Sequence, residues 1–243
     1  MSTARNNGEG SCAGSVISAS VSLATASKAC QGLSRTWPRQ ISAKVNRRRE
    51  KISIMESWHL SEQSVSSKGQ KSCQLTADHQ TVNFTLGDGL RTRFGASTFD
   101  RNLDAIRRNL DFDLSEGDAL ERLRAIDAWA LDYITEHSER LLKKKLSRAE
   151  VENGYTPLVR TYGSCASAKT KINIRGPRAA TYWLPTGEQM PDCPAEGTWQ
   201  DYAYKVQVSI PQLWIMQGTF GLLLEATALC LSPPAAVNPF AKS

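Results

Sequence analysis

Cysteines at metal-binding or redox spacing are absent from this sequence. The chain has six cysteines, and no two of them lie within four residues of each other. Zinc ribbons and Cys-x-x-Cys redox sites both need such close pairs, so the spacing excludes them. Scattered cysteines in a chain of 243 residues are instead typical of free thiols in a reducing compartment. The six are Cys12, Cys30, Cys73, Cys165, Cys193 and Cys230.

A long, uninterrupted apolar run is also absent. The most apolar window, residues 213–231, approaches membrane-spanning length, but Gln217-Gly218 interrupts it and Glu225 lies inside it. A carboxylate within a bilayer costs roughly 2.5–3.5 kcal/mol on insertion scales. We therefore predict two buried strands joined by a Gln-Gly turn. We predict neither a membrane span nor a secretory signal peptide.

Motifs of common enzyme families are missing as well. The sequence has no dinucleotide-binding Gly-x-Gly-x-x-Gly, no phosphate-binding Gly-Lys-Ser loop and no His-Glu-x-x-His. Gly163-Ser164-Cys165 is weakly similar to the nucleophile segment of thiol proteases, but all three histidines precede it, whereas that family has its histidine downstream. Asp111 and Asp113 lie close in sequence, yet no later strand adds an acid in an Asp-x-Asp or Glu-x-Lys pattern. We predict no catalytic residues, no metal site and no cofactor.

Charge divides the chain into two parts. The formal net charge is +6, but residues 1–54 contain nine basic and two acidic residues, whereas residues 55–243 contain 21 basic and 22 acidic ones. The positive excess therefore belongs to residues 1–54. The basic total is no argument that the remainder binds nucleic acid.

Residues 1–54 are rich in serine, poor in acids and without apolar periodicity. Such a composition buries too little surface to offset the entropy of ordering, so we predict a disordered tail or leader. Alternatives are an organelle transit peptide and a true translation start at Met55. The basic run at 47–51 is a nuclear signal, a phosphate-binding arm or a solvated linker.

The domain prediction for the rest follows from the same patterns. We predict a linker over 55–80, one folded domain over 81–231, and a flexible Pro- and Ala-rich tail over 232–243. Ordered structure should begin near Val82, where apolar and polar residues start to alternate. Gly87-Asp88-Gly89 then supplies the turn of a hairpin whose second strand spans about 91–95.

A helical insertion is predicted at about 115–154. Ser115 and Asp118 form a start signal for an amphipathic helix of about seven turns, because apolar residues then recur at spacings of three and four. Ser147 and Glu150 form the capping box of a second, short helix. We interpret the acids of the long helix as its solvated face. The apolar stripe comprises Leu120, Leu123, Ile126, Ala130, Ile134, His137 and Leu141.

Period-two patterns follow the helices and predict a series of strands. The apolar run at 222–224 is typical of a central strand that is buried on both faces. Strands before and after a helical segment indicate an α+β fold. The predicted strands span 159–162, 169–175, 178–184, 202–210, 212–217 and 219–231.

The strand at 169–175 carries the clearest functional pattern. Lys169, Lys171, Asn173 and Arg175 share one face because side chains alternate along a strand, and apolar residues or threonine occupy the other face. Three cations on an open face match a phosphate backbone. The surrounding segment 140–178 has ten basic and two acidic residues, a net charge of +8.

Aromatic residues accompany these cations. Arg178, Tyr182 and Trp183 follow on the next strand, and basic side chains beside aromatic rings are typical of sequence-tolerant single-strand binders. The alternatives are a solubilising sheet face, lysines that complement the helix dipole, and aromatics that belong to the core, Trp199 included. The predicted nucleic-acid-binding residues are Lys143, Lys144, Lys145, Lys169, Lys171, Arg175, Arg178, Tyr182 and Trp183.

Six short segments, taken in order, resemble the single-stranded DNA-binding proteins of large nucleocytoplasmic DNA viruses and related algal viruses. They are Leu-Leu-Lys-Lys-Lys-Leu-Ser at 141–147, Glu-Val at 150–151, Tyr-Thr-Pro-Leu-Val at 155–159, Lys-Thr-Lys-Ile at 169–172, Leu-Trp-Ile-Met at 213–216 and Phe-Gly-Leu at 220–222. The resemblance covers about residues 85–231. It implies an OB-like antiparallel β-barrel or strongly curved sheet that coats unpaired DNA in replication, recombination or repair.

By this analogy Lys169, Lys171 and Arg175 would line the strand-binding groove. One departure concerns the C-terminus: many proteins with this role end in an acidic tail that recruits partners, whereas residues 232–243 contain no acid. Recruitment of partners through the C-terminus is therefore in doubt.

Two functional hypotheses result. The first is a non-catalytic protein that binds single-stranded nucleic acid, DNA more than RNA, although no residue demonstrably reads a 2′-hydroxyl. The second is a structural or scaffold protein whose basic strand contacts an acidic protein surface. Self-association and replication proteins as partners stay open, as does localisation in the nucleus, at a viral replication site or, with a transit peptide, in an organelle.

Overall fold

The computed structural model describes residues 55–98, 104–114 and 117–233. Every described residue belongs to one compact unit within Gln40–Ser243. The predicted N-terminal tail, 1–54, falls outside the described residues, as does the predicted C-terminal tail, 232–243, except Ser232, which ends β14, and Pro233. Within the described ranges, no helix is long and apolar enough to cross a membrane.

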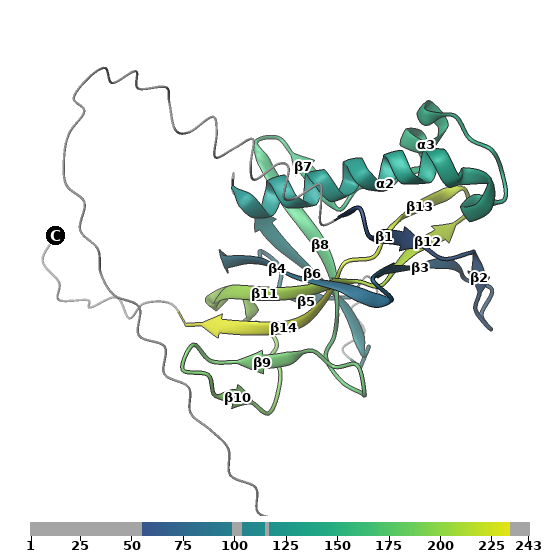
Figure 1. Ribbon diagram of the computed structural model, residues 1–243. Coiled ribbons are helices and arrows are strands. Elements are labelled where there is room, and N and C mark those ends of the chain that lie inside the picture. The colour runs from purple at the N-terminus through teal and green to yellow at the C-terminus, as the bar shows by residue number, and fades with distance from the viewer. Residues whose placement is uncertain (1–54, 99–103, 115–116, 234–243) are drawn as a thin grey trace, which may run out of the picture. The chain divides into compact units, whose positions relative to one another are not determined.

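Strands dominate the described structure and form one mixed sheet of 14 strands, accompanied by two α-helices (Figure 1). Helices and strands in separate stretches of chain agree with the α+β prediction. The strands are β1 (Trp58–Leu60), β2 (Ser64–Val65), β3 (Lys71–Ala77), β4 (Gln80–Leu90), β5 (Ala96–Ser97), β6 (Arg107–Leu114), β7 (Val159–Tyr162), β8 (Cys165–Asn173), β9 (Thr181–Trp183), β10 (Gln189–Met190), β11 (Ala203–Ile210), β12 (Gln212–Met216), β13 (Thr219–Leu222) and β14 (Glu225–Ser232). The helices are α2 (Asp118–Leu142) and α3 (Arg148–Gly154), and η1 (Trp199–Asp201) is a single 3-10 turn.

Five strands lie side by side in the order β4-β11-β14-β8-β6. Neighbours in this five-strand path are antiparallel except β14 and β8, which are parallel, so the sheet is mixed and not antiparallel as predicted. Just beyond β4, Arg91 forms an isolated bridge with Asp113 of β6, and the Asp113 amide donates to the Arg91 carbonyl over 2.8 Å. The two ends of the path therefore meet at one bridge, although no continuous ladder closes the sheet.

The core lies on the face of these strands where every second side chain is buried. Strands β6 and β8 both alternate buried and partly exposed residues, as period-two strands should. Burying a large apolar side chain contributes about 1.5–3 kcal/mol, so this set dominates the stability of the fold. The largest fully buried side chains are Tyr204, Phe112, Leu60, Leu75, Leu110, Leu123, Ile126, Ile134, Leu141, Ile172, Ile210 and Leu213.

Helix α2 has the length that the apolar stripe predicts. Its buried residues include the predicted stripe except His137, which is only partly buried while Ser138 is buried in its place; Asp127 is buried in addition. The helix departs from helical geometry at His137, which shifts the stripe by one residue. Gly117 is the N-cap and makes no side-chain cap, and Ser115 of the predicted start signal lies outside the described residues.

One acid of α2 is not on the solvated face where we expected it. Asp127 is buried and accepts hydrogen bonds from the Tyr155 hydroxyl over 2.7 Å and the Leu158 amide over 3.0 Å. Burial raises the pKa of the Asp127 carboxyl, and these hydrogen bonds oppose the rise. Asp127 thus fastens α2 to the segment that leads into β7.

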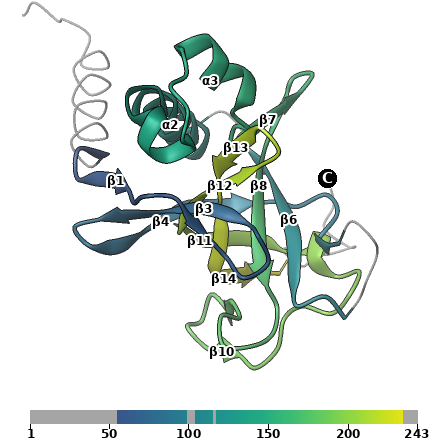
Figure 2. The same ribbon diagram turned by 90° about the vertical axis from the view of Figure 1, so that its right-hand side faces the viewer.

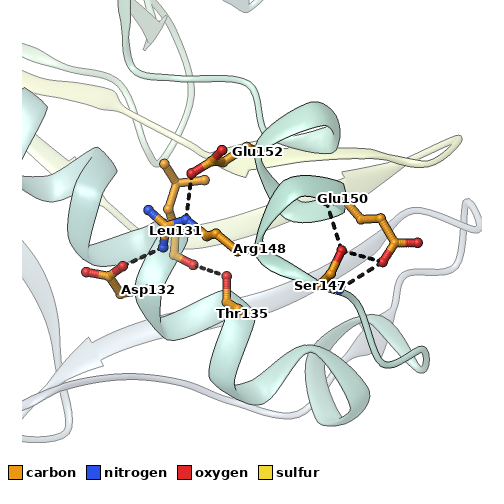
Figure 3. A network of polar contacts seen from close by, with 7 residues as sticks. All are labelled: Leu131, Asp132, Thr135, Ser147, Arg148, Glu150 and Glu152. Carbon is orange, nitrogen blue, oxygen red and sulfur yellow. Dashed lines mark hydrogen bonds and ion pairs between the residues drawn. The ribbon is translucent and has the colours of Figure 1, made fainter.

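Helix α3 begins with the capping box that the sequence predicts. The Ser147 side chain accepts from the Glu150 amide, and the Glu150 carboxylate accepts from the Ser147 amide over 2.8 Å (Figure 3). Arg148 of α3 also reaches Asp132 of α2 and Glu152 of its own helix (Figure 3). Both views show α2 and α3 on one side of the strands and the β9–β10 hairpin on the opposite side (Figures 1 and 2).

The predicted linker over 55–80 is wrong. This segment forms β1, β2 and β3, and β3 pairs with β1, β2, β4 and β12. Its apolar residues Trp58, Leu60, Cys73 and Leu75 are buried in the common core. These apolar residues alternate in short pieces, so the pattern lacked the length that marked the later strands.

The predicted hairpin turn at Gly87-Asp88-Gly89 is also wrong, because β4 runs through it. The register against β11 shifts twice near Gly87, so the glycines accommodate bulges within a long strand. The turn lies earlier, at Asp78-His79, where both residues have positive φ angles of 49° and 65° and join β3 to β4. Two such residues are what a tight two-residue hairpin requires.

The apolar stretch at 219–231 divides into two strands. The Gln217-Gly218 turn between β12 and β13 is confirmed, with both residues at positive φ. Leu223 and Leu224, predicted to lie in a central strand, instead form the break between β13 and β14. The chain there leaves β13, which pairs with β12, and enters the five-strand path as β14.

Candidate functional site

The alternation predicted for residues 169–175 is confirmed along β8. Ala168, Thr170 and Ile172 are buried, whereas Lys169 and Lys171 lie on the other face and are partly exposed. The buried residues contact the core, which leaves the two ammonium groups on the side that faces solvent. The strand ends at Asn173, so Arg175 lies just beyond it and is exposed.

Strand β6 adds a second row of polar side chains to this face. Asn109 lies directly opposite Lys171, Asp111 opposite Lys169, and Arg107 opposite Asn173. Side chains opposite each other on one face of an antiparallel pair lie about 5 Å apart at Cβ, so the two rows interact. The Lys171 ammonium donates to the Asn109 side-chain oxygen over 2.5 Å.

Strands β7 and β14 complete the surface on the two ends of β8. Arg160 of β7 lies opposite Ser167, and Glu225 of β14 lies beside Lys171, where it accepts a hydrogen bond from Asn173. We call this surface the β6–β8 face. It consists of Arg107, Asn109, Asp111, Asp113, Arg160, Ser167, Lys169, Lys171, Asn173 and Glu225.

Cations crowd the centre of the β6–β8 face. Burial lowers the pKa of the Lys171 ammonium, and the neighbouring charges of Lys169, Arg107 and Arg160 lower it further, whereas Asp111 opposes them. One oxygen of the Asp111 carboxylate is buried and accepts no hydrogen bond from the described residues. A phosphate at this position would relieve the repulsion among the cations.

One exposed aromatic ring lies at the end of this face that contains Cys165, and a second follows Arg93 in the chain. Tyr162 pairs with Cys165 at the end of the β7–β8 hairpin, and 63% of its surface is exposed. Arg93 forms an ion pair with Asp113 at 3.0 Å, and hydrogen bonds to Cys165 and then to Asp113 raise the pKa of its guanidinium. Phe94, the next residue in the chain, is 72% exposed.

Our sequence reasoning missed both rings. Tyr162 could have been predicted, because it lies two residues after Arg160 at the end of a predicted strand, and residues two apart on a strand share a face. Phe94 could not be predicted in this way, because its place depends on the bridge between Arg91 and a strand about 20 residues away. Exposed rings beside cations are the arrangement on which unpaired bases stack.

Tyr182 does not belong to the site. It is 4% exposed and packs edge-on against Trp199, with ring centroids 6.2 Å apart, so the alternative that both belong to the core is correct. Its short strand β9 pairs with β14 and β10 and turns this side chain inward. Trp183 is partly buried, and its ring nitrogen donates to Thr181 over 3.0 Å.

Lys143, Lys144 and Lys145 form a separate basic group. They follow the C-terminal end of α2, and Lys144 pairs with Glu150 at 3.8 Å. The charge of Lys143 acts on Cys73 of β3, and no strand pairing brings this segment beside β6 or β8. The structure therefore does not unite these lysines with the β6–β8 face. Arg178, in the connection from β8 to β9, borders a neighbouring groove.

Metal-binding clusters are not found within residues 55–98, 104–114 and 117–233: no three His, Cys, Asp or Glu side chains gather there. Cys73, Cys165, Cys193 and Cys230 are free thiols. What the site offers chemically is a row of cations with the ring of Tyr162 at one end and the exposed ring of Phe94 next to Arg93.

No protein-family model matches the chain, and no curated protein matches it either. Among solved structures, it is similar to gp2.5, a single-stranded DNA-binding protein encoded by bacteriophage T7, with 14% identity, a TM-score of 0.39 and coverage of 66% of this chain and 97% of gp2.5. It is also similar to the single-stranded DNA-binding protein from bacteriophage Enc34 in complex with single-stranded DNA, with 6% identity, a TM-score of 0.40 and coverage of 72% and 96%. Both are phage proteins, so the resemblance to proteins of large nucleocytoplasmic and algal viruses stays a prediction.

Proposed function

We propose that this chain is a non-catalytic protein that binds single-stranded nucleic acid, DNA more than RNA, along its β6–β8 face. Arg107, Arg160, Lys169 and Lys171 gather on this face, with the exposed ring of Tyr162 at one end and that of Phe94 next to Arg93, which pairs with Asp113. This combination of cations and exposed rings is the observation that supports the proposal. Phosphates neutralise the cations and unpaired bases stack on the rings, and neither contact selects a sequence.

The fold supports the same location. Numbered in chain order, the five strands of the path are β4, β6, β8, β11 and β14, and the second meets the first at the Arg91–Asp113 bridge. Five strands in a partly open barrel are the architecture of the OB fold, in which the face of the second and third strands binds oligonucleotides. Here those strands are β6 and β8. We therefore interpret the fold as OB-like, with α2 and α3 inserted between them.

The length of the face suits an oligonucleotide. From Cys165 to Asn173, β8 spans about 26 Å at roughly 3.3 Å per residue. OB folds contact about 4–16 nucleotides of single strand. A role in replication, recombination or repair would follow from such binding.

The second candidate is a scaffold or structural protein. It is favoured by Asp111, Asp113 and Glu225, which interleave with the cations: a largely acidic protein surface that carries some basic groups would match both signs of charge on this face. These carboxylates repel the phosphates of a nucleic acid, so they do not strengthen its binding. This candidate predicts self-assembly, or binding to an acidic protein surface, in the absence of nucleic acid.

Titration of the full chain with labelled oligo-dT at two salt concentrations distinguishes the two candidates. Four cations on a single strand give a slope of log K against log salt of about −3. Affinity should therefore fall about fiftyfold between roughly 50 mM and 200 mM salt. Absence of binding at low salt, with assembly in its place, would favour the scaffold.

A further inference from the structure

A polar groove lies beside the β6–β8 face. Its volume is about 620 Å³, which is within the range of sites that hold small molecules. Five strands and the β8–β9 connection border it, and most of the bordering side chains are polar. These polar residues are Gln74, Thr76, Thr81, Asn83, Arg178, Ser209, Gln212, Glu225 and Thr227.

Glu225 joins the groove to the β6–β8 face. It borders the groove, pairs in register with Lys171 and accepts a hydrogen bond from Asn173. A strand that follows the cations of β8 towards Asn173 would therefore arrive at the mouth of the groove. Arg178 also borders the groove, is exposed and makes no ion pair among the described residues, so it is free to contact a phosphate there.

The groove contains two side-chain amides that face each other. Gln74 of β3 lies directly opposite Gln212 of β12, and neither side-chain amide makes a hydrogen bond within the described part of the chain. No aromatic ring borders the groove. Ligand contacts inside it are therefore hydrogen bonds and not stacking, which is the opposite of the contacts at Tyr162.

We propose that this groove receives one unstacked base of the bound strand and reads it through Gln74 and Gln212, with Arg178 on the adjoining phosphate. A side-chain amide has one donor group and one acceptor, and it pairs bidentately with the N6 and N7 edge of adenine. The groove thus gives a preference for adenine at one position, within binding that is otherwise sequence-tolerant. This inference rests on the proposed function of the β6–β8 face.

The test uses the full chain and dT oligomers of about 12 nucleotides, a length within the range of OB-fold sites. In one series a single dA replaces dT at successive positions, which avoids the self-stacking of long adenine runs. Wild type should bind the best dA oligomer at least about fivefold more tightly than plain oligo-dT, the lower end of what one bidentate pair contributes.

Four substitutions test where the preference arises. Gln74→Leu and Gln212→Leu should each reduce the preference for dA, the double substitution should abolish it, and the salt dependence should stay unchanged because no charge is lost. Gln207→Leu is the matched control: Gln207 is exposed on β11 and does not border the groove, so the preference should persist. Arg178→Ala should weaken binding to every oligomer and make the salt slope shallower by about 0.7.

The outcomes separate the two proposals. The groove proposal is wrong if wild type shows no preference for dA, or if Gln74→Leu and Gln212→Leu both keep the full preference. If Lys169→Glu still weakens binding to all oligomers in that case, the proposed function of the β6–β8 face stands. If wild type binds no oligomer at low salt, the proposed function itself is wrong. Thermal melting of each variant shows whether the fold is intact.

Discussion

Lys171 of β8 lies directly opposite Asn109 of β6, and its ammonium donates a hydrogen bond to the Asn109 side-chain oxygen. This bond holds a partly buried cation at the centre of a face that also contains Lys169 and Arg107. Burial and the like charges both disfavour the ammonium form, so the charged form of Lys171 is destabilised in the free protein. An anion that binds there stabilises this charged form.

The first prediction concerns pH. The pKa of Lys171 is lowered in the free protein by burial and then by Lys169 and Arg107, and a bound phosphate raises it again. Between these two pKa values the complex holds more protons than the free protein, so affinity falls as pH rises through this window, below the usual lysine range. Lys171→Arg stays charged there and should show a flatter profile.

Fluorescence anisotropy with labelled oligo-dT at constant ionic strength, from about pH 7 to about pH 10, measures both profiles. The difference between wild type and Lys171→Arg isolates this residue from every other lysine. Identical profiles would show that no phosphate binds at Lys171.

The second prediction separates the two basic groups. Lys169→Glu should weaken binding to all single strands alike, by tenfold or more, and make the salt slope shallower by at least about 0.7. Lys145→Glu is the matched control, because Lys145 is exposed at the end of α2 and away from the β6–β8 face. A larger loss for Lys145→Glu than for Lys169→Glu would move the interface to the helices.

The third prediction concerns the exposed rings. Tyr162→Ala and Phe94→Ala should each lower affinity by about 1–3 kcal/mol, since each removes one stacking surface. Both side chains are largely exposed, so the midpoint of urea unfolding should stay unchanged. Tyr162→Phe keeps the ring and should keep most of the affinity; equal losses for Phe and Ala at this position would exclude stacking.

The fourth prediction concerns Tyr182, whose buried hydroxyl has no hydrogen-bond partner among the described residues. Burial raises the pKa of this phenol, so it stays neutral at all relevant pH values. Tyr182→Phe removes a polar group without changing the packing and should leave the free energy of unfolding equal or up to about 1 kcal/mol higher. Tyr182→Ala should lower it by about 3–5 kcal/mol because it leaves a cavity beside Trp199.

Urea unfolding measures the stability of both Tyr182 variants, and oligo-dT titration measures their affinity. Tyr182→Phe should bind as wild type does. A loss of affinity in a fully folded Tyr182→Phe variant would show that the Tyr182 hydroxyl contributes to binding.

Local pattern predicted the parts of the fold that depend on neighbours in sequence. The α2 stripe, the Ser147–Glu150 capping box and the two faces of β8 each follow from residues a few positions apart. Lys169 and Lys171 could be assigned to an open face for the same reason. The period of two is a property of the strand itself and needs no knowledge of its partners.

Long-range pairing determined the rest, and the sequence could not supply it. Strand β6 meets β8 across about 60 residues that include both helices, so the contribution of Arg107 and Asn109 was not predictable. Tyr182 was misassigned because β9 is short and has aromatics on both faces, and only its pairing with β14 decides which is buried. Gly87-Asp88-Gly89 has turn chemistry, yet a bulge uses the same residues.

The location of the interface is the central claim, and photochemical crosslinking tests it most directly. Oligo-dT irradiated with the full chain at low salt should crosslink to the peptides that contain Tyr162 and Phe94, because aromatic side chains stacked on thymine lie in van der Waals contact with it. Lys169→Glu should reduce both crosslinks. Crosslinks confined to residues 1–54 or to the 143–145 connection, and unchanged in Lys169→Glu, would contradict the account.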